Sequence, residues 1–83
     1  MDPVEAANDW FNIHVRGKKF KRKQGEIVYL AESLKIDSAY LRHYGFVTAT
    51  VKLRDTRNSK AVSVIQPVLN HYWVEVKDDA SAD

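Results

Sequence analysis

The sequence predicts an α+β fold, in which an N-terminal helix and a pair of short helices pack on a three-stranded antiparallel meander. Two patterns indicate this class. Apolar residues recur at helical spacing in three segments before residue 46, and they alternate with polar residues after it. The chain has 83 residues, 45% of them hydrophobic, which suits one small domain. We expect residues 1–77 to form that domain and residues 78–83 to be a disordered acidic tail.

The first helix is expected at about residues 3–15. Asp2 is a good N-cap, Pro3 fits the first helical position, and Glu5 can reach back to complete a capping box. Gly17 should end the helix. Two adjacent apolar stripes follow the helix, one with Val4, Ala7 and Phe11 and the other with Ala6, Trp10 and Ile13. The wide apolar face that they form predicts firm docking on the rest of the domain.

A second and a third helix are expected before residue 46. Along residues 26–34 the apolar positions at helical spacing are Ile27, Leu30, Ala31 and Leu34. The same segment is rich in residues that favour strands, but the complete stripe favours a helix. Asp37 and Gly45 are good residues to begin and end the next helix, with Leu41 and Tyr44 facing inward.

Three strands are expected in the second half. "FVTATVKLR" alternates apolar and polar residues, "AVSVIQ" ends at Pro67, and "HYWVEVK" places Tyr72 and Val74 on one face. On this register Trp73 lies on the outer face beside Glu75. An exposed tryptophan there would mark a partner surface or a contact in a homodimer.

The stretch "YLAESLKIDSAYLRHYGF", residues 29–46, resembles the helix-turn-helix and winged-helix DNA-binding proteins. Ala31 corresponds to the small residue where two helices cross, and Leu34 and Ile36 bracket the turn. Lys35 stands where many members carry glycine, so the resemblance implies a positive φ there. It therefore implies a helix-turn-helix-like pair as the DNA-reading element.

The resemblance also implies which residues contact DNA. The recognition helix would be residues 37–44, with Ser38, Ala39, Arg42 and His43 facing outward. The turn "RDTRNSK" would act as a wing, with Arg54, Arg57 and Lys60 near the DNA backbone or minor groove. The implied function is that of a small DNA-binding regulator or accessory factor.

Charge patterning independently favours a polyanion partner. The segment "RGKKFKRK" contains no acid and six basic residues, namely Arg16, Lys18, Lys19, Lys21, Arg22 and Lys23. We expect it to form a short edge strand or an ordered loop that contacts phosphates. Phe20 within it either anchors the segment to the core or stacks on a base. Without residues 78–83 the chain carries 13 basic and 8 acidic groups, a net charge of +5. Nucleic acid is therefore the expected partner, and the resemblance implies duplex DNA over RNA.

Composition argues against several other classes. The chain has no cysteine, its three glycines are isolated, and its three histidines lack the spacing of metal ligands. We therefore expect no metal, no cofactor and no enzymatic activity. The apolar runs are too short to span a membrane, and the acidic N-terminus lacks a signal core, so a cytoplasmic location is expected. The alternative function is an assembly module that uses the sheet edge or the Trp73 face.

Overall fold

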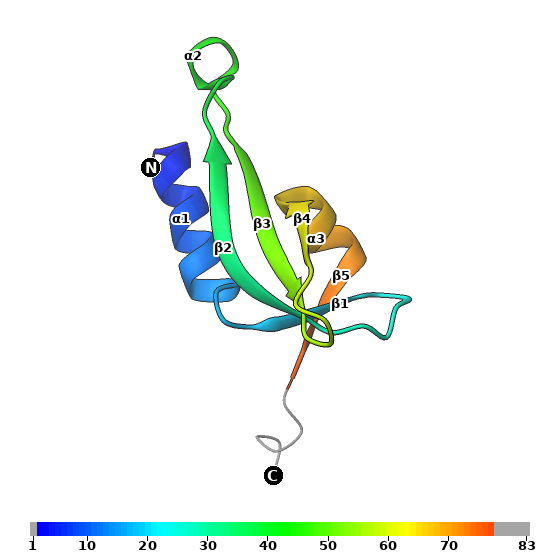
Figure 1. Cartoon of the computed structure of the whole chain (residues 1–83). Coiled ribbons are helices and arrows are strands. Elements are labelled where there is room, and N and C mark those ends of the chain that lie inside the picture. The colour runs from blue at the N-terminus through cyan, green and yellow to red at the C-terminus, as the bar shows by residue number, and fades with distance from the viewer. Residues whose placement is uncertain (1, 78–83) are drawn as a thin grey trace.

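The structure, a computed structural model, describes residues 2–77 as three helices and a five-stranded antiparallel sheet (Figure 1). In chain order the elements are α1 (Pro3–His14), β1 (Lys19–Arg22), β2 (Tyr29–Asp37), α2 (Leu41–Tyr44), β3 (Thr48–Asp55), β4 (Ala61–Ile65), α3 (Gln66–Tyr72) and β5 (Trp73–Val76). The strand order is β4-β3-β2-β1-β5. β1 to β4 therefore form a meander, and β5 returns to pair with β1.

The α+β class was predicted correctly, but the predicted three-stranded meander with a helix-turn-helix-like pair is wrong. Two further strands, β1 and β2, complete a sheet of five. The sheet curls, so that β1 runs across the lower ends of β2 and β3 (Figure 1). α1 packs beside β2, and α3 contacts β3, β4 and β5.

The helix predicted at residues 26–34 is instead largely strand β2, and a β-bulge explains the error. The register with β3 shifts between Ala31 and Ser33, which inserts one extra residue into β2. Before the bulge Tyr29 and Ala31 are buried, whereas after it Leu34 lies opposite the buried Val51. Because of the extra residue, inward-facing side chains no longer recur at every second position of β2. The resulting spacing of the apolar residues resembles that of a helix.

The predicted recognition helix is reduced to a single turn. Asp37 ends β2, and its carboxylate accepts a hydrogen bond from the Ala39 amide at 2.9 Å. α2 then ends at Gly45, whose φ of 75° agrees with the predicted helix end. Tyr44, which was expected in the core, is 70% exposed. Lys35 lies within β2 and lacks the positive φ that the resemblance implied.

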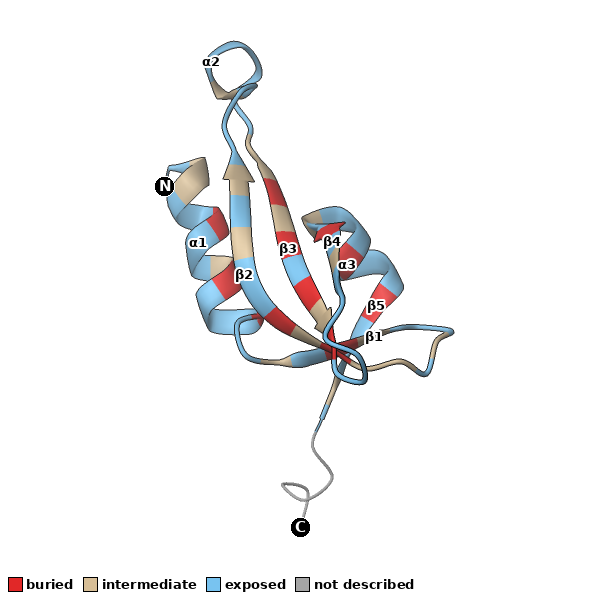
Figure 2. Ribbon diagram, in the orientation of Figure 1, coloured by how far each residue is buried: buried red, intermediate tan, exposed pale blue. Residues whose placement is uncertain are grey.

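α1 agrees with the first predicted helix. The Asp2 carboxylate accepts from the Val4 amide at 2.8 Å, so the cap forms on Val4 instead of the expected Glu5. In the first predicted stripe Ala7 and Phe11 are buried, whereas in the second Trp10 is partly buried against the core and Ile13 is 64% exposed. Figure 2 shows the buried residues of α1 on the side that faces β2.

Two further expectations change in the sheet. β1 lies between β2 and β5, so the basic segment contributes an interior strand, not an edge strand or a loop. Phe20 is buried, which confirms that it anchors β1 to the core. Trp73 is also buried, at 5% exposure, so the predicted exposed Trp73 face is wrong. Its ring meets Tyr29 edge to face, with centroids 5.3 Å apart.

Asp55, at the end of β3, should make stability depend on pH. Its buried carboxylate accepts from the Arg57 guanidinium at 3.0 Å and from the Arg57 amide at 2.8 Å. These bonds hold the pKa of Asp55 below its ordinary value. Because the folded pKa lies below the unfolded one, the stabilisation is present at neutral pH and is lost as pH falls through the folded pKa.

We therefore expect Asp55→Asn to lower the melting temperature at neutral pH. The difference from wild type should shrink as pH falls into the acid range, because protonation removes the same interaction from the wild type. Thermal melts across this range measure the effect. Asp9→Asn, on the exposed side of α1, is the matched control and should follow the wild-type curve. A constant difference between Asp55→Asn and wild type at every pH would contradict this interpretation.

Candidate nucleic-acid interface

The strand geometry divides the basic segment between two faces. Successive side chains alternate along β1, so Lys19 and Lys21 share one face and Arg22 shares the core-facing side with Phe20. Arg16 lies before the strand, with its guanidinium carbon 5.3 Å from the Phe11 ring centroid. Lys18 is half-buried in the connection to β1. The six basic residues therefore do not all lie on one face of the domain.

One end of the segment contributes to a pocket of about 450 Å³ between the β1–β2 loop and α3. We call it the basic–aromatic pocket; it is lined by Arg22, Lys23, Gln24, Val68, Tyr72 and Trp73. Arg22 places its guanidinium carbon 4.8 Å from the Trp73 ring centroid. It also lies 5.6 Å from the Tyr29 ring centroid, and its Nη1 donates to the Tyr29 hydroxyl at 3.4 Å. Cation–π contacts thus hold a positive charge at the pocket.

Backbone contacts join the two sides of the pocket. The Lys23 amide donates to the Tyr72 carbonyl at 2.9 Å, which fixes the end of α3 against the end of β1. The β1–β2 loop turns back through the Gly25 amide, which donates to the Arg22 carbonyl at 2.9 Å. The Lys21 ammonium also donates to the Gly25 carbonyl, at 3.3 Å. These bonds position Lys23 beside Tyr72.

The pocket combines two kinds of binding group. Arg22 and Lys23 supply positive charge, and Tyr72 supplies an aromatic ring that is 65% exposed. Trp73 forms the buried wall against which Arg22 lies. A flat ring with an attached negative charge matches this set, because the ring can stack on Tyr72 while the anion meets the basic groups.

Two of the predicted wing residues, Arg54 and Arg57, make ion pairs within the domain. Arg54 bonds both carboxylate oxygens of Glu32, which holds the pKa of Glu32 below its ordinary value, and Arg57 pairs with Asp55. Lys60 is exposed at the start of β4. Two of the three predicted wing cations therefore carry their own counter-charges.

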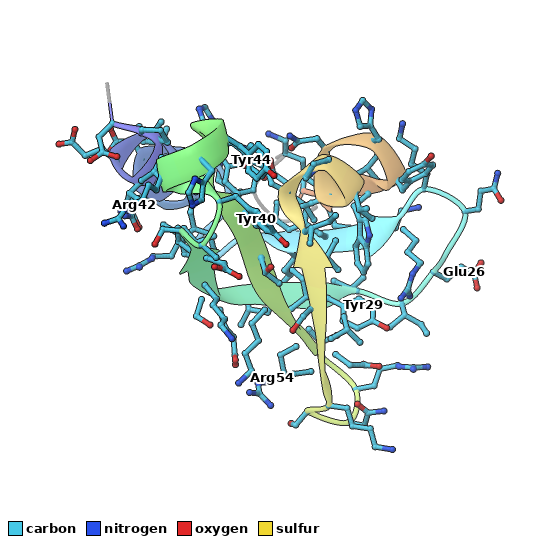
Figure 3. The ribbon with its side chains drawn as sticks, turned by 90° about the horizontal axis from the view of Figure 1, so that it is seen from above. Glu26, Tyr29, Tyr40, Arg42, Tyr44 and Arg54 are labelled. Atoms are coloured by element: carbon cyan, nitrogen blue, oxygen red, sulfur yellow. The ribbon has the colours of Figure 1, made fainter. Side chains whose placement is uncertain are left out.

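The predicted recognition residues lie at the tip of the β2–β3 hairpin, where Ser38, Arg42 and His43 are exposed. Beside them is a cluster that we call the aromatic tip, formed by Tyr40, Tyr44 and Phe46. Tyr40 stacks on Phe46 with centroids 5.5 Å apart, and it lies 6.0 Å from the Tyr44 centroid. Figure 3 shows Tyr40 and Tyr44 close together near α2.

The predicted contact residues thus fall into three separate regions: the basic segment, the aromatic tip and the β3–β4 turn. Arg42 at the tip and Arg54 near the far end of β3 lie well apart (Figures 1 and 3). Arg22 and Lys23 are the predicted residues that reach the pocket. Sequence reasoning missed Tyr72, which the expected strand placed in the core. The signal that could have found it is Pro67, which suits the first turn of a helix that ends at Tyr72.

Comparison with protein-family models, with curated proteins and with solved structures found no match to this chain. Within residues 2–77, no helix is both long and apolar enough to cross a membrane. The same residues contain no group of three or more acidic, histidine or cysteine side chains placed to hold a metal ion.

Proposed function

We propose that the protein binds single-stranded nucleic acid, with the basic–aromatic pocket as the site of one nucleotide. The observation that carries this proposal is the placement of Arg22 and Lys23 beside the exposed ring of Tyr72 in one pocket. The expectation of duplex DNA depended on a recognition helix at residues 37–44, where the only regular structure is the last residue of β2 and the single helical turn of α2. A single strand exposes the faces of its bases, which a duplex keeps stacked.

Each group has a distinct role in this proposal. Tyr72 stacks on a base, a contact that tolerates any sequence because every base has an aromatic face. Arg22 is already held over Trp73, so little side-chain freedom is lost when it meets a phosphate or a base edge. Lys23, on the exposed rim, pairs with the backbone phosphate and makes the affinity depend on salt.

A second candidate function is docking of a protein partner at the aromatic tip. Three aromatic rings gather there outside the core, with Tyr40 and Phe46 each 49% exposed and Tyr44 70% exposed. Exposed aromatic clusters of this kind are typical of the centres of protein interfaces. Substitution at the tip therefore belongs in the same binding experiment.

Binding to fluorescent oligonucleotides, followed by anisotropy at two salt concentrations, tests the proposal. We expect wild type to prefer single-stranded RNA or DNA over duplex DNA. Tyr72→Ala should weaken single-strand binding by about 1–3 kcal/mol, the contribution of one stacked base. Lys23→Ser should lower the slope of log K against log salt by about 0.7, as expected for one lost phosphate contact on a single strand.

Matched controls locate the site. Lys60→Ser removes the same charge from the distant β3–β4 turn and should leave the affinity nearly unchanged. Tyr44→Ala removes an exposed tyrosine at the aromatic tip and should also leave single-strand binding unchanged. If Tyr44→Ala weakens binding and Tyr72→Ala does not, the pocket is the wrong site. If no oligonucleotide binds at low salt, the proposed function itself fails and docking at the tip becomes the leading candidate.

A further inference from the structure

Strand β4 forms one edge of the sheet (Figure 1). The Asp55 amide donates to the Lys60 carbonyl at 2.7 Å, so these two residues are a hydrogen-bonded pair. Along an antiparallel ladder, hydrogen-bonded and non-hydrogen-bonded pairs alternate, which fixes the type of every later pair between β3 and β4. Val62 and Val64 therefore bond to β3. The amides of Ala61, Ser63 and Ile65 and the carbonyls of Ala61 and Ser63 point away from β3, and all three residues are exposed. The Ile65 carbonyl begins α3, so this residue offers mainly its amide.

The sequence of β4 lacks the residues that usually prevent strand pairing. Its sequence, "AVSVI", contains no charge, proline or glycine, and its register with β3 is uninterrupted. The opposite edge differs. Because Lys23 and Tyr72 form a hydrogen-bonded pair, the backbone amides and carbonyls of Trp73 and Glu75 point away from β1. Trp73 is buried and Glu75 carries a carboxylate, so β5 is the protected edge.

We infer that β4 pairs antiparallel with β4 of a second copy of this chain, about a two-fold axis at Ser63. In this register Ser63 lies opposite the partner's Ser63, and the two residues exchange both backbone hydrogen bonds. Each Ile65 amide donates to the carbonyl of the partner's Ala61. A second copy fits this edge because pairing about Ser63 places apolar side chains opposite one another on both faces and no like charges opposite each other. The pairing joins the two sheets into one.

The side chains agree with this register on both faces. The exposed Ile65 meets the partner's Ala61 on the outer face, and the half-exposed Val62 meets the partner's Val64 on the inner face. Beyond the strand, Lys60 faces the partner's Gln66, so no like charges oppose each other. The pairing uses none of the residues that line the basic–aromatic pocket, and the inference does not depend on nucleic-acid binding. A contact this small predicts a dimer that dissociates on dilution.

A single introduced cysteine tests the register, because the natural chain contains none. Hydrogen-bonded pairs across antiparallel strands have Cα atoms about 5.5 Å apart, within the range that a disulfide spans. Ser63→Cys should therefore form a disulfide-linked dimer under mild oxidation. Ser38→Cys, also exposed but on the β2–β3 hairpin, should cross-link at least about tenfold more slowly. Equal rates for the two variants would overturn the inference.

Sedimentation equilibrium tests the edge without an added thiol. Wild type should pass from monomer to dimer as concentration rises, and Ser63→Pro should stay monomeric. The β3–β4 ladder survives this change because the Ser63 amide points outward, and the melting temperature checks that the fold is kept. Glu75→Pro makes the matched change on β5 and should leave the dimer intact. A monomeric wild type, a dimer that survives Ser63→Pro, or a dimer lost in Glu75→Pro would each overturn the two-fold β4 pairing.

Discussion

Replacing Phe11 with alanine is expected to lower the free energy of unfolding by about 3–5 kcal/mol, the range for a buried aromatic. Phe11 is 1% exposed and belongs to the core cluster that joins α1 to the sheet. Its ring also lies beneath the Arg16 guanidinium, which would lose that contact. Urea unfolding at constant temperature measures the change. For a domain of this size such a loss consumes much of the total stability.

Ile13→Ala is the matched control for this prediction, because it removes a large apolar side chain from the same helix. Ile13 is 64% exposed, so its truncation should change the unfolding free energy by no more than about 0.5 kcal/mol. Comparable losses in the two variants would show that both faces of α1 are buried, in contradiction to the packing of α1 on β2.

Trp73→Ala is expected to have a similarly large effect, about 3–5 kcal/mol. The ring is buried, meets Tyr29 edge to face, and supports the Arg22 guanidinium. Its loss would leave a void where β5 joins β1. Thermal or urea unfolding measures the cost, and Trp73→Phe should recover part of it by keeping an aromatic ring in the core.

Tyr72→Ala is the informative comparison, since Tyr72 adjoins Trp73 and is 65% exposed. It should unfold nearly as wild type does, and its defect should appear in nucleic-acid binding. Trp73→Ala would then lower stability, whereas Tyr72→Ala would weaken binding and leave stability nearly unchanged. If Trp73→Ala is stable and Tyr72→Ala is unstable, Tyr72 faces the core and Trp73 faces outward, as the sequence predicted. That result would contradict the structure.

The elements that were predicted correctly are those whose sequence pattern has one period. α1 has a proline start and an inward stripe, and the inner positions Ala49, Val51 and Leu53 of β3 alternate without interruption. β4 was likewise expected between a polar turn and Pro67. In each case local spacing and tertiary burial agree, so the sequence alone is sufficient.

The errors occur where a local feature interrupts the period. In β2 the bulge after Ala31 adds one residue, so inward positions before and after it differ in phase. Near the C-terminus, Pro67 lies in the first turn of α3, and this helix displaces Tyr72 from the expected strand. The strand therefore begins at Trp73, which turns inward. Neither interruption leaves a periodic signal in the sequence.

The candidate site was only partly predictable for a related reason. The basic run identified Arg22 and Lys23, but charge density says nothing about which side chains point the same way. Strand alternation in β1 and the position of α3 decide that, and both depend on pairing between distant segments. Tyr72 becomes part of the site only because the Lys23–Tyr72 hydrogen bond brings it there.

The pairing of β5 with β1 has a consequence for how the protein acquires its proposed binding site. β1 lies near the start of the chain, and its Lys19 pairs with Val76 at the end of the last strand. Such a contact closes a loop that spans most of the domain, which slows folding relative to chains held together by local contacts. The basic–aromatic pocket lies at this closure, with Arg22 on one side and Trp73 on the other. A nascent chain would therefore gain the pocket only after β5 has been synthesised and has paired, so folding and ligand binding should become complete together.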